Sequence, residues 1–199
     1  MNMKFRALTL LMLASAILSL TGCVPAWKMV RQDNIAYSVT AQGYSVNLPP
    51  GWLEIAPGNG AVTLLSLDGE DLDLIRISRF DNDKAMQNIK KVPSPKDLPA
   101  ELADDFIASS KAAEPVSNLT VLVNEPATLG GKNGFHLRYG FSNPDGVRYQ
   151  SDIYGVCTDN GFYTVLFRAP VLHYFDEHLG EFQKMVTSFQ FLPMRARSG

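Results

Sequence analysis

The three histidines are the first side chains to test for chemistry, because imidazole nitrogen is a common metal ligand and general base. His173 and His178 lie in the segment HYFDEH. Two ligands on one helix must be three or four residues apart to share a face, and these are five apart. His173 and Glu177 have the spacing to bind a metal ion weakly, but the simpler interpretation is that they belong to the solvated first turn of a helix. His136 alternates with apolar residues and is expected to stand alone on one strand face, so we expect no metal site.

Cys157 is the next candidate, because a cysteine thiolate is a strong nucleophile. It lies in the stretch YQSDIYGVCTD, where no histidine or lysine is close enough in sequence to lower the pKa of the thiol. Free cysteines are among the most often buried residues. We therefore interpret Cys157 as a small buried residue of a strand and not as a catalytic one.

Two loops have the composition of ligand-binding loops without their pattern. A phosphate-binding loop needs a glycine five residues before its Gly-Lys pair and a Ser or Thr after it, and around LGGKNG these positions hold Pro126 and Asn133. The acidic loop DGEDLD, residues 68–73, lacks the ligand order of a calcium-binding loop. No Gly-x-Ser-x-Gly nucleophile motif occurs. The sequence thus predicts two hairpin turns here, no catalytic or cofactor-binding residue, no cofactor, and no enzyme activity.

The elements that position these residues can be predicted from periodicity. From Ile35 the chain consists mainly of short stretches with alternating apolar residues, which predicts strands. The connectors at residues 143–146 and 159–161 carry Asn, Pro, Asp and Gly, which favour tight turns and antiparallel pairs. One helix is expected from Asp97 through SSKAA, and another follows Pro170. The second helix has a single apolar stripe, formed by Phe175, Leu179, Phe182, Val186 and Phe189.

The predicted elements imply a definite orientation for three side chains. Phe182 should face the sheet, and Glu181 should face solvent on the opposite side of the same helix. Trp52, at the end of an expected strand, is interpreted as a core anchor and not as a platform for a ligand.

The N-terminus has the composition of an export signal. Two basic residues precede an uncharged run of 14 residues, from Ala7 to Leu20. A helix needs about 20 apolar residues to cross a bilayer, so this run is too short for a stable span. A basic start, a short apolar middle and small residues before a break are typical of a secretory signal. The run ends in Leu20-Thr21-Gly22-Cys23, which resembles the lipobox of bacterial lipoproteins.

This resemblance implies that residues 1–22 are a removed signal peptide and that Cys23 is lipidated. Its thiol would carry a diacylglycerol and its new amino group a third chain such as palmitate. Two or more acyl chains anchor a protein stably. Val24, in place of the aspartate that retains enteric lipoproteins at the inner membrane, implies an outer-membrane protein facing the periplasm. The alternative location is the inner membrane, and the alternative to a lipoprotein signal is an ordinary cleaved signal peptide. Residues 23–34 are expected to form a lipidated N-terminus and a tether.

Charge and length limit the classes of function. Removal of 22 residues from 199 leaves 177, enough for one domain, with 16 basic and 20 acidic side chains and a net charge near −4. Nucleic-acid binders need clustered cations to displace counterions from phosphate. No such cluster occurs, so nucleic acid is not expected as a partner.

Residues 35–192 resemble a known family. The phrase GYSVNLPPGW is similar to the opening of PsbP-like domains, which include photosystem PsbP proteins and bacterial DcrB lipoproteins. Two further regions also resemble this family. They are the hairpin NEPATLGGKNGFHLRYGF in the middle of the domain and the segments YTVLFRAP, FQKMVTSF and FQF at its end. The resemblance implies an α+β fold, an antiparallel sheet with helices packed on both faces, in a single domain followed by a tail at 193–199. The family's members mainly bind or stabilise partners and share no catalytic set.

Three functions follow in order of preference. The first is a lipid-anchored, non-catalytic binding or accessory module for a protein partner of the cell envelope. The second is a carrier of a small apolar ligand held between sheet and helices, and the third is an enzyme with an unrecognised site. A large apolar pocket would favour the carrier, whereas an exposed apolar patch would favour the binding module.

Overall fold

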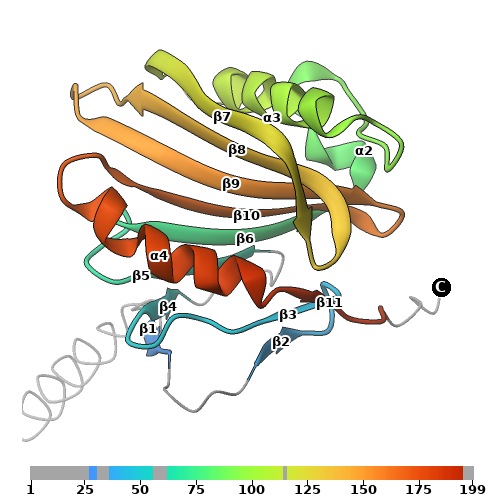
Figure 1. The fold of residues 1–199 in the computed structure, drawn as a ribbon, viewed down its shortest axis with the longest axis horizontal. Coiled ribbons are helices and arrows are strands. Elements are labelled where there is room, and N and C mark those ends of the chain that lie inside the picture. Colours follow the sequence, from blue (N-terminus) through green and yellow to red (C-terminus); the bar gives the residue numbers. More distant parts are fainter. Residues whose placement is uncertain (1–26, 31–35, 56–61, 114–115, 195–199) are drawn as a thin grey trace, which may run out of the picture.

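The main sheet has eight antiparallel strands in the described part of the chain, in the spatial order β1-β4-β5-β6-β10-β9-β8-β7 (Figure 1). The structure is a computed structural model, which describes residues 27–30, 36–55, 62–113 and 116–194. The strands are β1 (Trp27–Met29), β4 (Leu53–Ile55), β5 (Val62–Ser66), β6 (Leu74–Phe80), β7 (Ser117–Leu129), β8 (Lys132–Ser142), β9 (Arg148–Thr158) and β10 (Gly161–Pro170). The predicted hairpins are confirmed: β7 and β8 turn at Gly130-Gly131, both with positive φ, and β5 pairs with β6.

A second, smaller sheet has the order β11-β3-β2. Its strands are β2 (Tyr37–Val39), β3 (Tyr44–Val46) and β11 (Gln190–Phe191). The chain returns from the last helix to pair Phe191 with Tyr44, so the two ends of the domain meet in this sheet. Tyr44 stacks on Phe189 at 5.4 Å between ring centroids, which joins the small sheet to the core of the large one.

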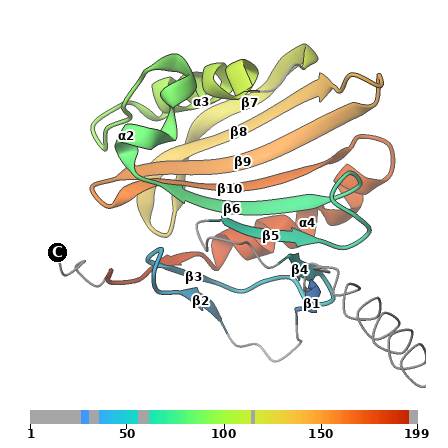
Figure 2. The same ribbon diagram turned by 180° about the vertical axis from the view of Figure 1, so that it is seen from behind.

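Helices lie on both faces of the main sheet, as the fold class predicted (Figures 1 and 2). α3 (Pro99–Ala113) packs against β8 and β7, and α4 (Tyr174–Thr187) packs against β10 and β9. Two short segments, α2 (Asn82–Ala85) and η1 (Gln87–Ile89), lead from β6 to α3. The alternation of strand side chains explains this arrangement, because successive residues of one strand face opposite helices.

Aromatic rings fill the space between α4 and the sheet. Phe167 of β10 stacks on Phe175 at 5.4 Å and lies 5.6 Å from Phe182, and all three side chains are fully buried. Trp52 is 0% exposed beside them, so its prediction as a core anchor is confirmed. A second cluster under α3 contains Phe135, Phe162 and the aliphatic residues of α3. These two clusters hold the helices to the sheet.

The ends of the chain differ from the expectation in one respect. Trp27–Met29, in the segment expected to be a tether, pairs with Leu53–Ile55 as the outermost strand of the main sheet. The signal segment, Cys23 and residues 195–199 lie outside the described residues. In the described chain, none of the helices combines the length and apolar character needed to cross a membrane.

Candidate functional site

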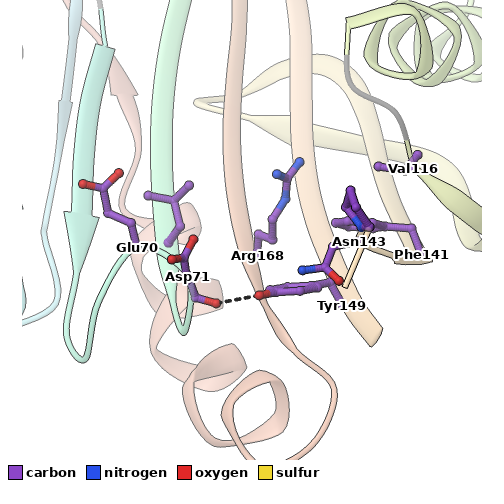
Figure 3. A pocket seen from close by; sticks show the side chains of 9 residues that line it. Glu70, Asp71, Val116, Phe141, Asn143, Tyr149 and Arg168 are labelled. Atoms are coloured by element: carbon purple, nitrogen blue, oxygen red, sulfur yellow. Dashed lines mark hydrogen bonds between the residues drawn. The ribbon is translucent and has the colours of Figure 1, made fainter. Parts of the chain in front are cut away.

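A hollow of about 390 Å³ opens at one end of the main sheet, where β8 and β10 end and β9 and β6 begin (Figure 3). Its walls come from four strands, the β5–β6 loop, the β8–β9 turn and the residue before β7. The residues that line it are Glu70, Asp71, Leu74, Val116, Phe141, Asn143, Pro144, Tyr149 and Arg168. It lies on the α3 face, because Phe141 and Tyr149 point to the same side of the sheet as the cluster under α3.

One wall of the hollow is aromatic and rigid. Phe141 and Tyr149 are directly opposite each other in the β8–β9 register, and their rings stack at 5.6 Å. The Arg168 guanidinium lies 5.1 Å from the centre of the Phe141 ring, within cation–π range, and its Nε donates a hydrogen bond to Ser151 Oγ. The sheet therefore holds a planar cation and two aromatic rings in fixed positions.

The opposite wall is the acidic loop between β5 and β6. The Tyr149 hydroxyl donates a hydrogen bond of 2.9 Å to the backbone oxygen of Asp71, which ties this loop to β9 (Figure 3). Burial, followed by the charge of Asp71, raises the pKa of Tyr149, so the hydroxyl stays a donor at neutral pH. The exposed side chains of Glu70 and Asp71 add negative charge to the rim. The hollow thus combines aromatic surface with charges of both signs.

An ion network occupies the other face of the sheet, across β7, β8 and β9. His136 Nε2 lies 2.7 Å from Asp152 Oδ1, and His136 Nδ1 lies 3.1 Å from Glu125 Oε1. Arg138 Nε donates to the same Asp152 oxygen at 2.9 Å. The expectation that His136 stands alone on its face is wrong, because Glu125 and Asp152 come from neighbouring strands that only the register brings together.

The hydrogen bonds of the network favour the charged forms of His136 and Asp152. Burial alone would lower the pKa of His136, but the hydrogen bonds to Asp152 and Glu125 outweigh it and the pKa is raised. Burial would raise the pKa of Asp152, but hydrogen bonds from His136 and Arg138 outweigh it and the pKa is lowered. Both ring nitrogens of His136 face carboxylates, and its ring stacks on Tyr154 at 4.4 Å. This arrangement favours the protonated imidazole, in which both ring nitrogens are donors and neither has a lone pair to offer.

Cys157 is buried, as predicted. Its thiol lies 3.5 Å from Asn82 Oδ1, and burial, followed by the charges of Asp97 and Asp159, raises its pKa to about 11. The thiol is therefore protonated at neutral pH, whereas nucleophilic cysteines are thiolates.

The two histidines of the α4 segment lie in different surroundings. His173 is exposed and its Nε2 is 3.1 Å from Glu177 Oε2, the pair whose spacing suggested a weak clamp. His178 is buried, with its ring 5.5 Å from that of Trp52 in an edge-on contact. The prediction of a solvated first turn is correct for His173. It is wrong for His178, because the segment that carries Trp52 covers the side of the helix on which His178 lies.

The family of the chain can be stated from comparison with known proteins. The profile of the PsbP family matches residues 32–191. The chain belongs to the PsbP family. A search of curated protein sequences finds no match.

Two solved structures with TM-scores of at least 0.50 agree on the fold. The PsbP-family chain is 14% identical to the cyanobacterial PsbP (CyanoP) of Synechocystis sp. PCC 6803, with a TM-score of 0.53 over 86% of this chain and 98% of that chain. A point mutant of the protein Mog1 is 11% identical, with a TM-score of 0.50 over 84% and 96%. LpqN of Mycobacterium tuberculosis, described as involved in cell envelope biogenesis, is 13% identical, with a TM-score of 0.48 over 84% and 91%. At these identities the similarity concerns the fold alone.

Proposed function

We propose that this PsbP-family protein is a non-catalytic accessory module that binds a protein partner in the cell envelope. In this proposal acyl chains on Cys23 hold it at the outer membrane, facing the periplasm, and the hollow at the end of the sheet contacts the partner. The observation that carries the proposal is the composition of that hollow. A stacked Phe141–Tyr149 pair and Arg168 lie beside an acidic rim.

This composition resembles the centre of protein–protein interfaces. Such interfaces are enriched in tyrosine, other aromatics and arginine, and a few of these residues contribute most of the binding free energy. The aromatic wall is already ordered by β8 and β9, so little side-chain entropy would be lost on binding. The hollow is open to solvent, which suits a protruding side chain of a partner.

The structure supports an apolar carrier less well. A carrier needs an enclosed, largely apolar cavity, usually of several hundred Å³. Between α4 and the sheet that space is occupied by the buried rings of Phe167, Phe175 and Phe182. Large exposed apolar side chains are distributed over many elements and include Met29, Phe80, Val92, Leu98, Val121, Leu122, Val147 and Leu172.

An enzyme is also less well supported. Nucleophilic catalysis requires a base within hydrogen-bond distance of the nucleophile. The Cys157 thiol contacts an asparagine and not a base, and both ring nitrogens of His136 are occupied by carboxylates.

The anchor can be tested separately from the binding function. Changing Cys23→Ser removes the thiol that would be acylated, so the protein is expected to leave the membrane fraction or to accumulate as an uncleaved precursor. Membrane fractionation with immunoblotting measures both outcomes. A variant that matures and fractionates like the parent protein would show that the lipoprotein interpretation is wrong.

Binding at the hollow can be tested by photo-crosslinking in intact cells. The photoreactive amino acid p-benzoylphenylalanine at Glu70, on the rim, is expected to give one adduct of defined mass. At Lys132, the first residue of β8 and at its other end, it should give none. Tyr149→Ala, which removes half of the aromatic wall, should reduce the Glu70 adduct at least tenfold at unchanged abundance. Equal adducts from Glu70 and Lys132, or no effect of Tyr149→Ala, would argue against this hollow.

A further inference from the structure

The β5–β6 loop meets the first turns of α4 at a group of three potential metal ligands. One carboxylate oxygen each of Asp68 and Asp73 and one ring nitrogen of His178 lie within 4.8 Å of one another. Asp68 and Asp73 are separated from His178 by more than 100 residues of sequence. Only the packing of α4 beside this loop brings them together.

His178 is the residue that distinguishes this group from an ordinary acidic loop. Its side chain is only 9% exposed, and the nearest charged atom, Glu181 Oε2, lies 3.8 Å from Nδ1, beyond hydrogen-bond distance. Within the described residues, neither ring nitrogen has a hydrogen-bond partner. A mostly buried imidazole whose nitrogens have no protein partner has them available for a ligand. A bound ion beside the two carboxylates would satisfy the imidazole.

Asp73 is held in place for such a role. It is fully buried, and its Oδ1 accepts hydrogen bonds from Ser66 Oγ at 2.8 Å and from the backbone nitrogen of Leu67 at 2.6 Å. Its Oδ2 accepts one hydrogen bond, from the backbone nitrogen of Asp68 at 3.0 Å, which leaves this oxygen capacity for a further partner. Asp68 is exposed, so its side chain can rotate toward a ligand.

The local charge favours a cation. Residues 68–73 carry four carboxylates and residues 174–183 carry three, and neither segment contains a lysine or an arginine. Glu181, one of these carboxylates, already accepts the Trp52 indole N–H at 3.1 Å. A divalent cation between the loop and the helix would offset the repulsion among these groups.

We propose that Asp68, Asp73 and His178 form a binding site for a divalent transition-metal ion, with Zn²⁺ as the best match. Imidazole with two carboxylates suits Zn²⁺, whereas Ca²⁺ and Mg²⁺ prefer oxygen ligands alone. Zn²⁺ takes nitrogen and oxygen ligands at about 2.0–2.2 Å, so the three atoms must close in from their present separation, chiefly by rotation of Asp68. The fourth position of a tetrahedral site would be taken by water or by Glu181.

The ion would attach the β5–β6 loop to α4. The same loop supplies Glu70 and Asp71 to the hollow of Figure 3, so the metal would fix one wall of that hollow. The metal site does not depend on the proposed partner, because its ligands and its test involve this chain alone.

Calorimetric titration tests the proposal directly. The full-length protein, purified in detergent and stripped with EDTA, is titrated with Zn²⁺ and is expected to bind one ion at this site. Asp68→Asn should weaken binding at least tenfold, and this exposed change should leave the metal-free thermal unfolding curve unaltered. His178→Gln should weaken it further. Absence of Zn²⁺ binding, or unchanged affinity in Asp68→Asn, would overturn the proposal.

A matched control separates this site from the other histidine pair. His173→Ala removes the exposed His173–Glu177 pair and is expected to change the affinity less than twofold. If His173→Ala abolishes binding instead, the ion belongs to that surface pair and the proposal fails. Trp52 provides an independent readout, because its ring contacts His178 edge-on at 5.5 Å. In a Trp27→Phe background, its fluorescence should change on addition of Zn²⁺ with the same midpoint as the calorimetric titration, and a Zn²⁺-insensitive Trp52 would place the ion elsewhere.

Discussion

Phe182→Ala is expected to lower the free energy of unfolding by about 3–5 kcal/mol, as large-to-small changes at buried aromatic positions do. Phe182 is 0% exposed under α4, with its ring 5.6 Å from Phe167 and 6.3 Å from Tyr154. The rings around it are themselves held by the sheet, so they cannot collapse fully into the void. Equilibrium urea denaturation, monitored by circular dichroism, measures the change.

The neighbouring residues of α4 provide the controls. Gln183 is exposed, and Gln183→Ala should cost less than about 0.5 kcal/mol. Glu181 is more informative, because it is exposed, as the sequence predicted, and yet has a buried hydrogen-bond partner. Its carboxylate accepts the Trp52 Nε1–H at 3.1 Å, and Trp52 is fully buried, so Glu181→Ala should cost about 1–3 kcal/mol. Equal losses for Phe182→Ala and Gln183→Ala would show that the orientation of the helix is wrong.

The parts of the fold that depend on local signals could be predicted from the sequence. The turns at residues 143–146 and 159–161 connect β8, β9 and β10 as expected, because Pro, Asn and Gly restrict the backbone within a few residues. The apolar stripe of α4 correctly placed Phe175 and Phe182 in the core. In each case the information lies within one element and its flanks.

The missed features all depend on contacts between distant elements. Nothing in the sequence around Asp152 points to a partner, and only the β8–β9 register places it beside His136 and Arg138. The return of Phe191 to Tyr44 and the pairing of Trp27 with Ile55 are likewise decided by the packing of the whole domain. In the sequence, His178 could be compared only with residues of its own helix, whereas its neighbours come from the β5–β6 loop and from Trp52. Spacing along one helix cannot reveal ligands supplied by another element.

Asp152→Ala should have the second large effect. It is expected to lower the free energy of unfolding by about 3–5 kcal/mol, because it removes one partner of a buried ion pair and leaves the other unpaired. Asp152 is fully buried, and its Oδ1 accepts hydrogen bonds from both His136 and Arg138, while Oδ2 has no hydrogen-bond partner among the described residues. Without this carboxylate, the His136 ring and the Arg138 guanidinium lose the acceptor that they share. Glu125→Gln, at the exposed end of the network, should cost less than about 1 kcal/mol, as exposed ion pairs do.

The pH dependence of unfolding distinguishes this ionic role from simple packing. The raised pKa of His136 contributes stability that is complete below its ordinary value of 6.5 and is lost as the pH rises through the folded-state value. The lowered pKa of Asp152 contributes stability above its ordinary value of 3.8, which is lost as the pH falls through the folded-state value. The network should therefore stabilise the fold most between about pH 4 and 6.5. Urea denaturation of the parent protein and of His136→Gln, from pH 4 to 9, measures this contribution. The parent's advantage over His136→Gln should shrink as the pH rises above 6.5, and an advantage independent of pH would mean that His136 acts there as a neutral ring.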